Sequence, residues 1–252
     1  MIEINKLTKK YGEKKVVDEV DLSLPKEKII AFIGSNGAGK STLISVVSRT
    51  LAKDSGEVHI DDRELKEWKN RDLSKRLSIL KQSNHLNIRL TVKDLVTFGR
   101  FPHSQGKITK EDEIKIKEAI EYMGIEELQD RFIDELSGGQ RQMAYIAMII
   151  AQDTEYIFLD EPLNNLDMQH SVLIMKVLRR LVSELGKTIM VVIHDINFVS
   201  CYADYVVAMK HGKIIKHGDT SEIIDSKVLN EVYDMDISIE EINGKNICLF
   251  YQ

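Results

Sequence analysis

Residues 34–42 form a glycine-rich stretch whose spacing suits the binding of phosphate groups. The stretch matches the pattern G-x-x-x-x-G-K-[ST] and reads Gly34-Ser35-Asn36-Gly37-Ala38-Gly39-Lys40-Ser41-Thr42. Its glycines permit a tight curl and a close approach of backbone N–H groups to phosphates, and a helix beginning at Lys40 would add its positive dipole end. We expect Lys40 to reach the β- and γ-phosphates, Ser41 to ligate Mg²⁺ and Thr42 to contact the α-phosphate.

Two acidic residues follow a second apolar run. Residues 156–159 read Tyr-Ile-Phe-Leu, which is typical of a buried strand, and Asp160 and Glu161 come directly after them. Ligands of α/β proteins bind beyond the carboxyl ends of the strands, so these two carboxylates are expected to face the ligand. We predict that Asp160 holds Mg²⁺ and that Glu161 activates the attacking water.

A second glycine-containing turn precedes the apolar helical run 143–151. It reads Leu136-Ser137-Gly138-Gly139-Gln140. Ser137 is a candidate N-cap, and the two glycines leave the amides of the first helical turn open to an anion. Because one chain rarely needs two phosphate cradles, we expect a head-to-tail dimer. Ser137 and Gly139 of one copy would then contact the nucleotide held by Lys40 of the other.

Hydrophobic periodicity predicts the elements that position these residues. Apolar residues alternate within residues 1–30, as in half-buried strands, and residues 29–33 form a continuous apolar run, as in a strand covered on both faces. A helix follows from Lys40. Residues 91–151 are predicted to be helical, with capping boxes at Thr91 and Thr109 and a helix stop at Gly124.

The remaining residues predict a second α/β portion. A strand at 156–159 is followed by a helix over 168–185 that Gly186 stops, and by a strand over 188–193. The tail from Ile237 alternates around Asn243-Gly244, which predicts a β-hairpin.

The composition is that of a globular protein without a basic field. Of 252 residues, 43% are hydrophobic and 30% are charged, with a formal net charge of −5. This acidic balance makes nucleic acid an unexpected partner. Cys201 and Cys248 are too few for a secreted disulfide framework, so we expect both to be buried apolar side chains in a reducing compartment. No apolar run approaches the roughly 20 residues of a spanning helix.

Along the chain, the glycine-rich stretch, the Ser137 turn and the acidic pair follow one another in the order found in the nucleotide-binding subunits of ATP-binding cassette (ABC) transporters. The three motifs resemble those of that family, and the match covers nearly all of the chain. The resemblance implies an α/β P-loop NTPase fold, in which a RecA-like core with an antiparallel β subdomain is interrupted by an α-helical subdomain. It implies an ATP-binding domain over 1–236, with its core at 1–84 and 155–220 and the helical subdomain at 85–154. Residues 237–252 would add a short β-hairpin extension.

Weaker positions gain a role through the same resemblance. Tyr11 matches the aromatic residue that stacks on adenine, Gln82 the glutamine that ligates Mg²⁺, and His194 the histidine that contacts the γ-phosphate. Residues 165–167 (Asn-Leu-Asp) match the loop that crosses the dimer interface. The chain departs from the family at Lys81, where proline is common, at Leu163, where threonine is common, and at Asn165, where a small residue is common.

The resemblance implies an ATPase that uses ATP and Mg²⁺, with Lys40, Glu161 and His194 as catalytic residues. It also implies a homodimer beneath polytopic permease subunits, peripheral to the cytoplasmic face of the cell membrane. Residues 96–103 and 109–112 resemble subunits of ferric-siderophore importers, and more broadly haem and cobalamin importers, although they could instead simply pack the helical insert. An extracytoplasmic siderophore-binding protein would be an indirect partner.

Two other readings remain from the sequence. A soluble cassette ATPase acting on ribosomes or DNA commonly has a second cassette, a coiled-coil insertion or a basic extension, and this chain shows none of these. A regulatory module that does not hydrolyse ATP would not need the complete set of catalytic residues.

Overall fold

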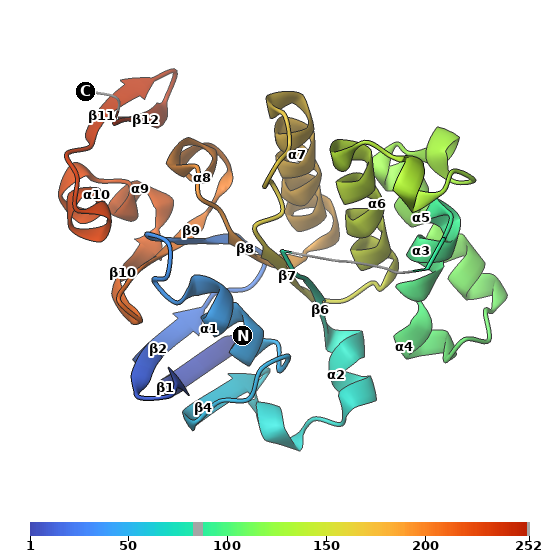
Figure 1. Ribbon diagram of the computed structural model, residues 1–252, viewed down its shortest axis with the longest axis horizontal. Helices are drawn as coiled ribbons and strands as arrows, with labels where there is room; N and C mark the ends of the chain where they lie inside the picture. The colour runs from blue at the N-terminus through green and yellow to red at the C-terminus, as the bar shows by residue number, and fades with distance from the viewer. Residues whose placement is uncertain (83–87, 251–252) are drawn as a thin grey trace. The chain divides into compact units, whose positions relative to one another are not determined.

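The computed structural model describes residues 1–82 and 88–250. Its contacts divide the chain into two units: the first joins Met1–Trp68 to Thr188–Gln252, and the second is Lys69–Lys187. The glycine-rich stretch 34–42 belongs to the first unit. The acidic pair and the Ser137 turn belong to the second (Figure 1).

The first 64 residues of the first unit supply an antiparallel sheet with the strand order β2-β1-β4-β5. Its strands are β1 (Ile2–Tyr11), β2 (Lys14–Leu24), β4 (Ser55–Ile60) and β5 (Arg63–Glu64). The register pairs Ile2 with Leu24 and Ile4 with Leu22, and all four side chains are buried. The alternation in the sequence therefore marks one buried face, as a period of two requires.

Parallel strands hold the glycine-rich stretch. β3 (Ile29–Ile33) pairs in parallel with both β8 (Thr188–Val192) and β9 (Tyr205–Lys210), and β10 (Lys213–Asp219) runs antiparallel to β9. All five residues of β3 are buried. A strand with neighbours on both sides and cover on both faces has no position for a polar side chain, which explains the continuous apolar run. Helix α1 (Lys40–Val47) begins seven residues after β3 ends.

The chain ends in short elements of the same unit. These are α8 (Ile196–Tyr202), α9 (Thr220–Ile223), α10 (Ser226–Tyr233), β11 (Ser238–Ile242) and β12 (Lys245–Leu249). The hairpin β11–β12 turns through Asn243 and Gly244, both with positive φ, which confirms the predicted turn. The hairpin packs on α8, because the Asn197 side chain accepts from the Cys248 amide at 2.8 Å and donates to the Cys248 carbonyl at 3.3 Å.

The second unit combines two parallel strands with helices. Strand β6 (Leu77–Leu80) pairs with β7 (Tyr156–Asp160). The helices are α2 (Asn70–Arg76), α3 (Val92–Phe98), α4 (Phe101–Ser104), α5 (Lys110–Met123), α6 (Gly138–Ala151) and α7 (Met168–Leu185). Helix α6 packs against both α3 and α5 (Figure 1). None of the helices in residues 1–82 and 88–250 is both long enough and apolar enough to cross a membrane.

The helix boundaries follow the predicted signals. Thr91 with Asp94, and Thr109 with Asp112, form complete capping boxes, each with aspartate in the place of the usual glutamate. Gly124 and Gly186 end α5 and α7 in the left-handed conformation. The residues that form each of these caps lie within four positions of one another. Tertiary packing therefore has little effect on where these helices begin and end.

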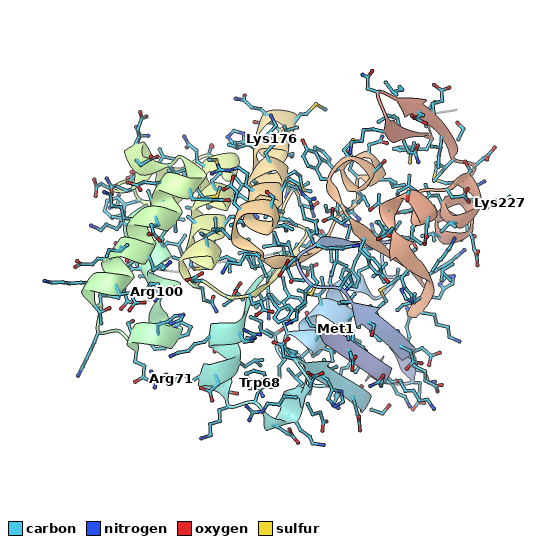
Figure 2. All side chains as sticks on the ribbon, turned by 180° about the vertical axis from the view of Figure 1, so that it is seen from behind. Met1, Trp68, Arg71, Arg100, Lys176 and Lys227 are labelled. Carbon is cyan, nitrogen blue, oxygen red and sulfur yellow. The ribbon has the colours of Figure 1, made fainter. Side chains whose placement is uncertain are left out.

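One buried ion pair fixes the helical part of the second unit. Arg100 lies among the helices of this unit (Figure 2). Its side chain is 4% exposed and donates from Nε to Asp112 Oδ1 at 2.8 Å and from Nη1 to the Ala151 carbonyl at 2.9 Å. Burial alone would raise the pKa of Asp112. Hydrogen bonds from Thr109 and the charge of Arg100 outweigh burial and lower that pKa to about 2. The carboxylate thus caps α5 and ties it to α6 through Arg100.

The expectation that both cysteines are buried is right for Cys248 and wrong for Cys201. Cys248 is 1% exposed, whereas Cys201 is partly exposed. The buried face of α8 carries Ile196, Val199 and Ser200. Cys201 lies one residue, or about 100° around the helix, from that face.

Replacing Asp112 with asparagine should destabilise the protein by about 3–5 kcal/mol, because Arg100 would stay buried without its counter-charge. Urea unfolding at pH 7 measures the effect. The control is Glu121→Gln, which removes an exposed partner of Lys117 and should cost less than about 1 kcal/mol.

The same variant provides a pH test. The pKa of Asp112 is depressed in the folded chain, so its contribution is complete above the unfolded value near 3.8 and is lost as the pH falls towards about 2. The stability difference between the wild type and Asp112→Asn should therefore shrink over this range. A difference that stays constant down to pH 2 would contradict the assignment.

Candidate functional site

The glycine-rich stretch lies tightly against its own unit. A Cβ on Gly34 would lie 2.1 Å from the Met209 carbonyl oxygen of β9, and a Cβ on Gly39 would lie 2.4 Å from the Val16 carbonyl oxygen of β2. Both distances are far below contact distance, and both glycines have positive φ, of 141° and 104°. These two glycines are therefore required by the packing of the loop on neighbouring strands, in addition to any ligand.

Lys40, the first residue of α1, is buried, and its ammonium group lies inside the loop. Nζ donates to the carbonyl oxygens of Gly34 at 2.8 Å and Ser35 at 3.0 Å. Two carbonyl oxygens of the loop therefore face the ammonium group. This placement brings a positive charge to the glycine-rich loop, which suits a polyanionic ligand.

The N-terminus of α1 has the features of an anion site. Its N-cap is Gly39, which offers no side-chain cap, and the first turn contains no acidic residue. Ser41 and Thr42 of that turn are partly exposed. Because the first-turn amides of a helix need acceptors, a helix end of this kind favours a bound anion.

Two other predicted residues of the first unit are exposed. Tyr11 ends β1 with 55% of its surface exposed, and the Lys9 ammonium lies 5.8 Å from the centre of its ring. An exposed aromatic face is available for stacking on a flat ligand. His194 follows β8 and is exposed, directly before Asp195, which caps α8 by accepting from the amides of Asn197 and Phe198.

In the second unit, the structure brings Gln82 and Glu161 together. Gln82 follows β6, Glu161 follows β7, and these strands are parallel neighbours. Gln82 Nε2 donates to Glu161 Oε2 at 2.6 Å. The side-chain carbonyl of Gln82 is therefore the oxygen that remains available for a ligand. Asp160, the last residue of β7, is 9% exposed.

The backbone around Glu161 adopts a rarely populated conformation. Glu161 has φ of 52°, in the left-handed region that costs most residues with a side chain about 1–2 kcal/mol. Asn165 has φ of 60°, a conformation that asparagine adopts more readily. Residues 161–166 form successive turns in which Asn164 N–H donates to the Glu161 carbonyl at 3.2 Å. Strain of this kind persists where the surroundings determine the conformation, and it is frequent at functional sites.

The Ser137 turn has the predicted helix cap. The Ser137 hydroxyl accepts from the Gln140 amide at 3.2 Å, and the Ser137 amide donates to Gln140 Oε1 at 3.1 Å, which completes a capping box at the start of α6. Ser137 and Gly138 are exposed, whereas Gly139 is buried. The turn lies near the 165–167 loop, since a Cβ on Gly138 would lie 4.0 Å from the Asn165 carbonyl oxygen.

Two contributors to the site have no signal in the sequence. Asn164 Nδ2 donates to Glu161 Oε2, the same oxygen that Gln82 contacts. Tyr233 of α10 accepts from the Gly34 amide at 3.2 Å, across 199 residues of sequence. The phenol of Tyr233 is neutral at physiological pH, and burial raises its pKa further, to about 12. Neither residue belongs to a short motif.

Comparisons with known proteins agree with this geometry. The family model described as "ABC transporter" matches residues 17–164. The petrobactin import ATP-binding protein YclP of Bacillus subtilis (strain 168) is 57% identical over 251 residues, which cover 100% of both chains. The petrobactin import ATP-binding protein FatE of Bacillus anthracis is 46% identical over 239 residues, which cover 95% of this chain and 96% of FatE.

A solved structure of a dimeric bacterial ABC transporter cassette also matches. Its TM-score is 0.78 at 27% sequence identity, and the match covers 87% of this chain and 99% of that chain. The similarity therefore extends beyond the motifs to the arrangement of the elements.

Tyr233→Phe tests whether α10 supports the glycine-rich loop. Removing the hydroxyl leaves the partly buried Gly34 amide without this acceptor, which should cost about 1–3 kcal/mol in urea unfolding and weaken binding of a fluorescent ATP analogue. The control is Tyr205→Phe, which loses an exposed hydrogen bond to His217 in the same unit and should leave both quantities nearly unchanged. Equal effects of the two variants would refute this support.

Proposed function

The chain belongs to the ABC transporter family and is an ATPase of that family, and we propose that it drives the import of an iron(III)–siderophore complex through a partner permease. Two relatives that match this chain over at least 95% of their length, at 57% and 46% identity, are both named petrobactin import ATP-binding proteins. Petrobactin is the cargo stated for those proteins. For this chain the proposal extends to the class of ferric siderophores.

The proposed nucleotide contacts follow the motifs. Lys40 and the amides of residues 34–42 neutralise the phosphates, and Tyr11 stacks on the adenine. His194 stabilises the phosphoryl group that is transferred, and Ser137 and Gly139 act on ATP held by the other copy of the chain. The buried Lys40 ammonium and the uncapped start of α1 support the first of these roles.

The residues proposed for Mg²⁺ fit that ion. Ser41, Gln82 and Asp160 offer a hydroxyl, an amide carbonyl and a carboxylate, which are the oxygen ligands that Mg²⁺ prefers. Within the described residues, no cluster of three or more histidine, cysteine or acidic side chains forms a site for another metal. When bound, Mg²⁺ would neutralise phosphate charge.

The hydrogen bond between Gln82 and Glu161 carries the catalytic part of the proposal. Two amide groups, of Gln82 and Asn164, donate to one oxygen of Glu161. They orient the carboxylate for the role of general base, which accepts a proton from the attacking water.

The proposed assembly is a homodimer peripheral to the cytoplasmic face of the cell membrane. Permease subunits would bind the dimer, and an extracytoplasmic siderophore-binding protein would deliver the cargo without contacting this chain. A dimeric cassette among the similar structures supports the homodimer, and the import names of the relatives support the permease.

Glu161→Gln should abolish ATP hydrolysis while preserving ATP binding. Glutamine still presents an oxygen to Gln82 and Asn164, but it cannot accept the proton of water. ATP should therefore trap the variant as a dimer in size-exclusion chromatography, whereas Lys40→Ala should weaken both binding and turnover. The control is Glu127→Gln, an exposed acid outside the motifs. Hydrolysis by Glu161→Gln at the wild-type rate would disprove the role of Glu161.

The cargo is tested by uptake. A deletion strain should lose uptake of ⁵⁵Fe-labelled ferric siderophores, and the wild-type gene should restore it where Glu161→Gln does not. Ferric petrobactin is the first member of the panel, because the relatives carry its name. Unchanged uptake of every siderophore in the panel would refute the proposed cargo class.

A further inference from the structure

The ring of His170 lies against Gly139, in the space that a side chain at position 139 would need. No motif assigns a role to His170. A Cβ on Gly139 would lie 2.5 Å from His170 Cδ2, 2.6 Å from Cγ and 2.8 Å from Nε2. Side-chain carbons do not approach this closely. The imidazole therefore lies against the bare Cα of Gly139, and only glycine leaves space for the ring there.

His170 is held in this position by Asp167. Its Nδ1 lies 2.9 Å and 2.8 Å from the two carboxylate oxygens of Asp167, and its amide donates to Asp167 Oδ1 at 2.8 Å. Asp167 is the N-cap of the 18-residue helix α7. An ionised carboxylate only accepts, so Nδ1 carries the proton and donates it. The ring cannot swing away from Gly139 without losing this bond.

The ring thus connects two loops that lie far apart in the sequence. On one side is the signature turn, residues 137–140, whose capping box fixes the start of α6. On the other side is the crossing loop, residues 165–167, which ends in the Asp167 cap of α7. Both loops belong to the second unit, and Gly138 already approaches Asn165.

We propose that His170 is a positioning residue that fastens the signature turn to the crossing loop, so that both loops of one subunit engage ATP on the other subunit as one rigid piece. This inference rests on the proposed function for the action between subunits. It also explains, from contacts within one chain, why position 139 is glycine: the imidazole of His170 occupies the space that a Cβ would need.

The test is a double-mutant cycle between Gly139 and His170, measured in the Glu161→Gln background as the ATP concentration that gives half-maximal dimer. Gly139→Ala should raise this concentration about tenfold, because the methyl group displaces the ring. His170→Ala removes all three ring atoms that a Cβ at position 139 would meet, and alone it should raise the concentration only a few-fold. The double variant should dimerise better than Gly139→Ala.

The outcome that overturns the proposal is equally specific. If the signature glycine serves only the approach of the nucleotide, His170→Ala will not rescue Gly139→Ala, and the double variant will be as impaired as Gly139→Ala or more so. Gln169→Ala, an exposed change on the neighbouring position of α7, is the control and should not rescue Gly139→Ala.

A second readout separates failure of this proposal from failure of the proposed function. The same cycle is measured without nucleotide, as the midpoint of urea unfolding, where the clash of Gly139→Ala with the ring should again be relieved by His170→Ala. If Glu161→Gln forms no dimer with ATP, the action between subunits fails. Absence of rescue in both readouts refutes the role of His170 itself.

Discussion

The lack of a side chain at Gly34 is the constraint on which the first unit depends. The carbonyl oxygen of Met209 lies where a Cβ would be, so the loop after β3 can follow its course only with glycine at this position. From there the loop is held at three points: the Gly34 amide on Tyr233, the Gly39 backbone against β2, and the Lys40 ammonium on the loop carbonyls. A loop fixed in this way can bind phosphates without first being ordered, which lowers the entropic cost of binding.

The second unit has the same kind of constraint at Gly139. There the space of a Cβ is occupied by a side chain, whereas at Gly34 it is occupied by the backbone of a strand. His170 fills the space, and Asp167 holds His170. The loop at Glu161 is fixed in a different way, because this residue has a side chain and still adopts a left-handed backbone conformation. Gln82 and Asn164 donate to its carboxylate and compensate for this conformation. In both units, therefore, the residues named by the motifs depend on residues that no motif names.

Local features of the fold could be predicted, because their causes lie within a few residues. The capping boxes at Thr91 and Thr109, the stop at Gly186 and the Asn243-Gly244 turn each follow from the chemistry of neighbouring positions. The Gly34 loop and the Ser137 cap are of the same kind. Tyr233 and His170 could not be predicted in this way. Tyr233 contacts Gly34, 199 positions away, and His170 contacts Gly139, 31 positions away. Hydrophobic periodicity carries no information about such contacts. The partial exposure of Cys201 likewise depends on which face of α8 is covered.

The central claim is that one chain holds ATP at residues 34–42 while a second chain completes the site with residues 137–140. Cross-linking between two differently tagged chains tests this claim most directly. One chain carries Asn36→Cys and the other Ser137→Cys, both exposed positions, with Glu161→Gln in each and serine replacing Cys201 and Cys248. The account predicts a disulfide between the two tags that forms with ATP and not without it. No cross-link with ATP, or an equal yield without nucleotide, would contradict it.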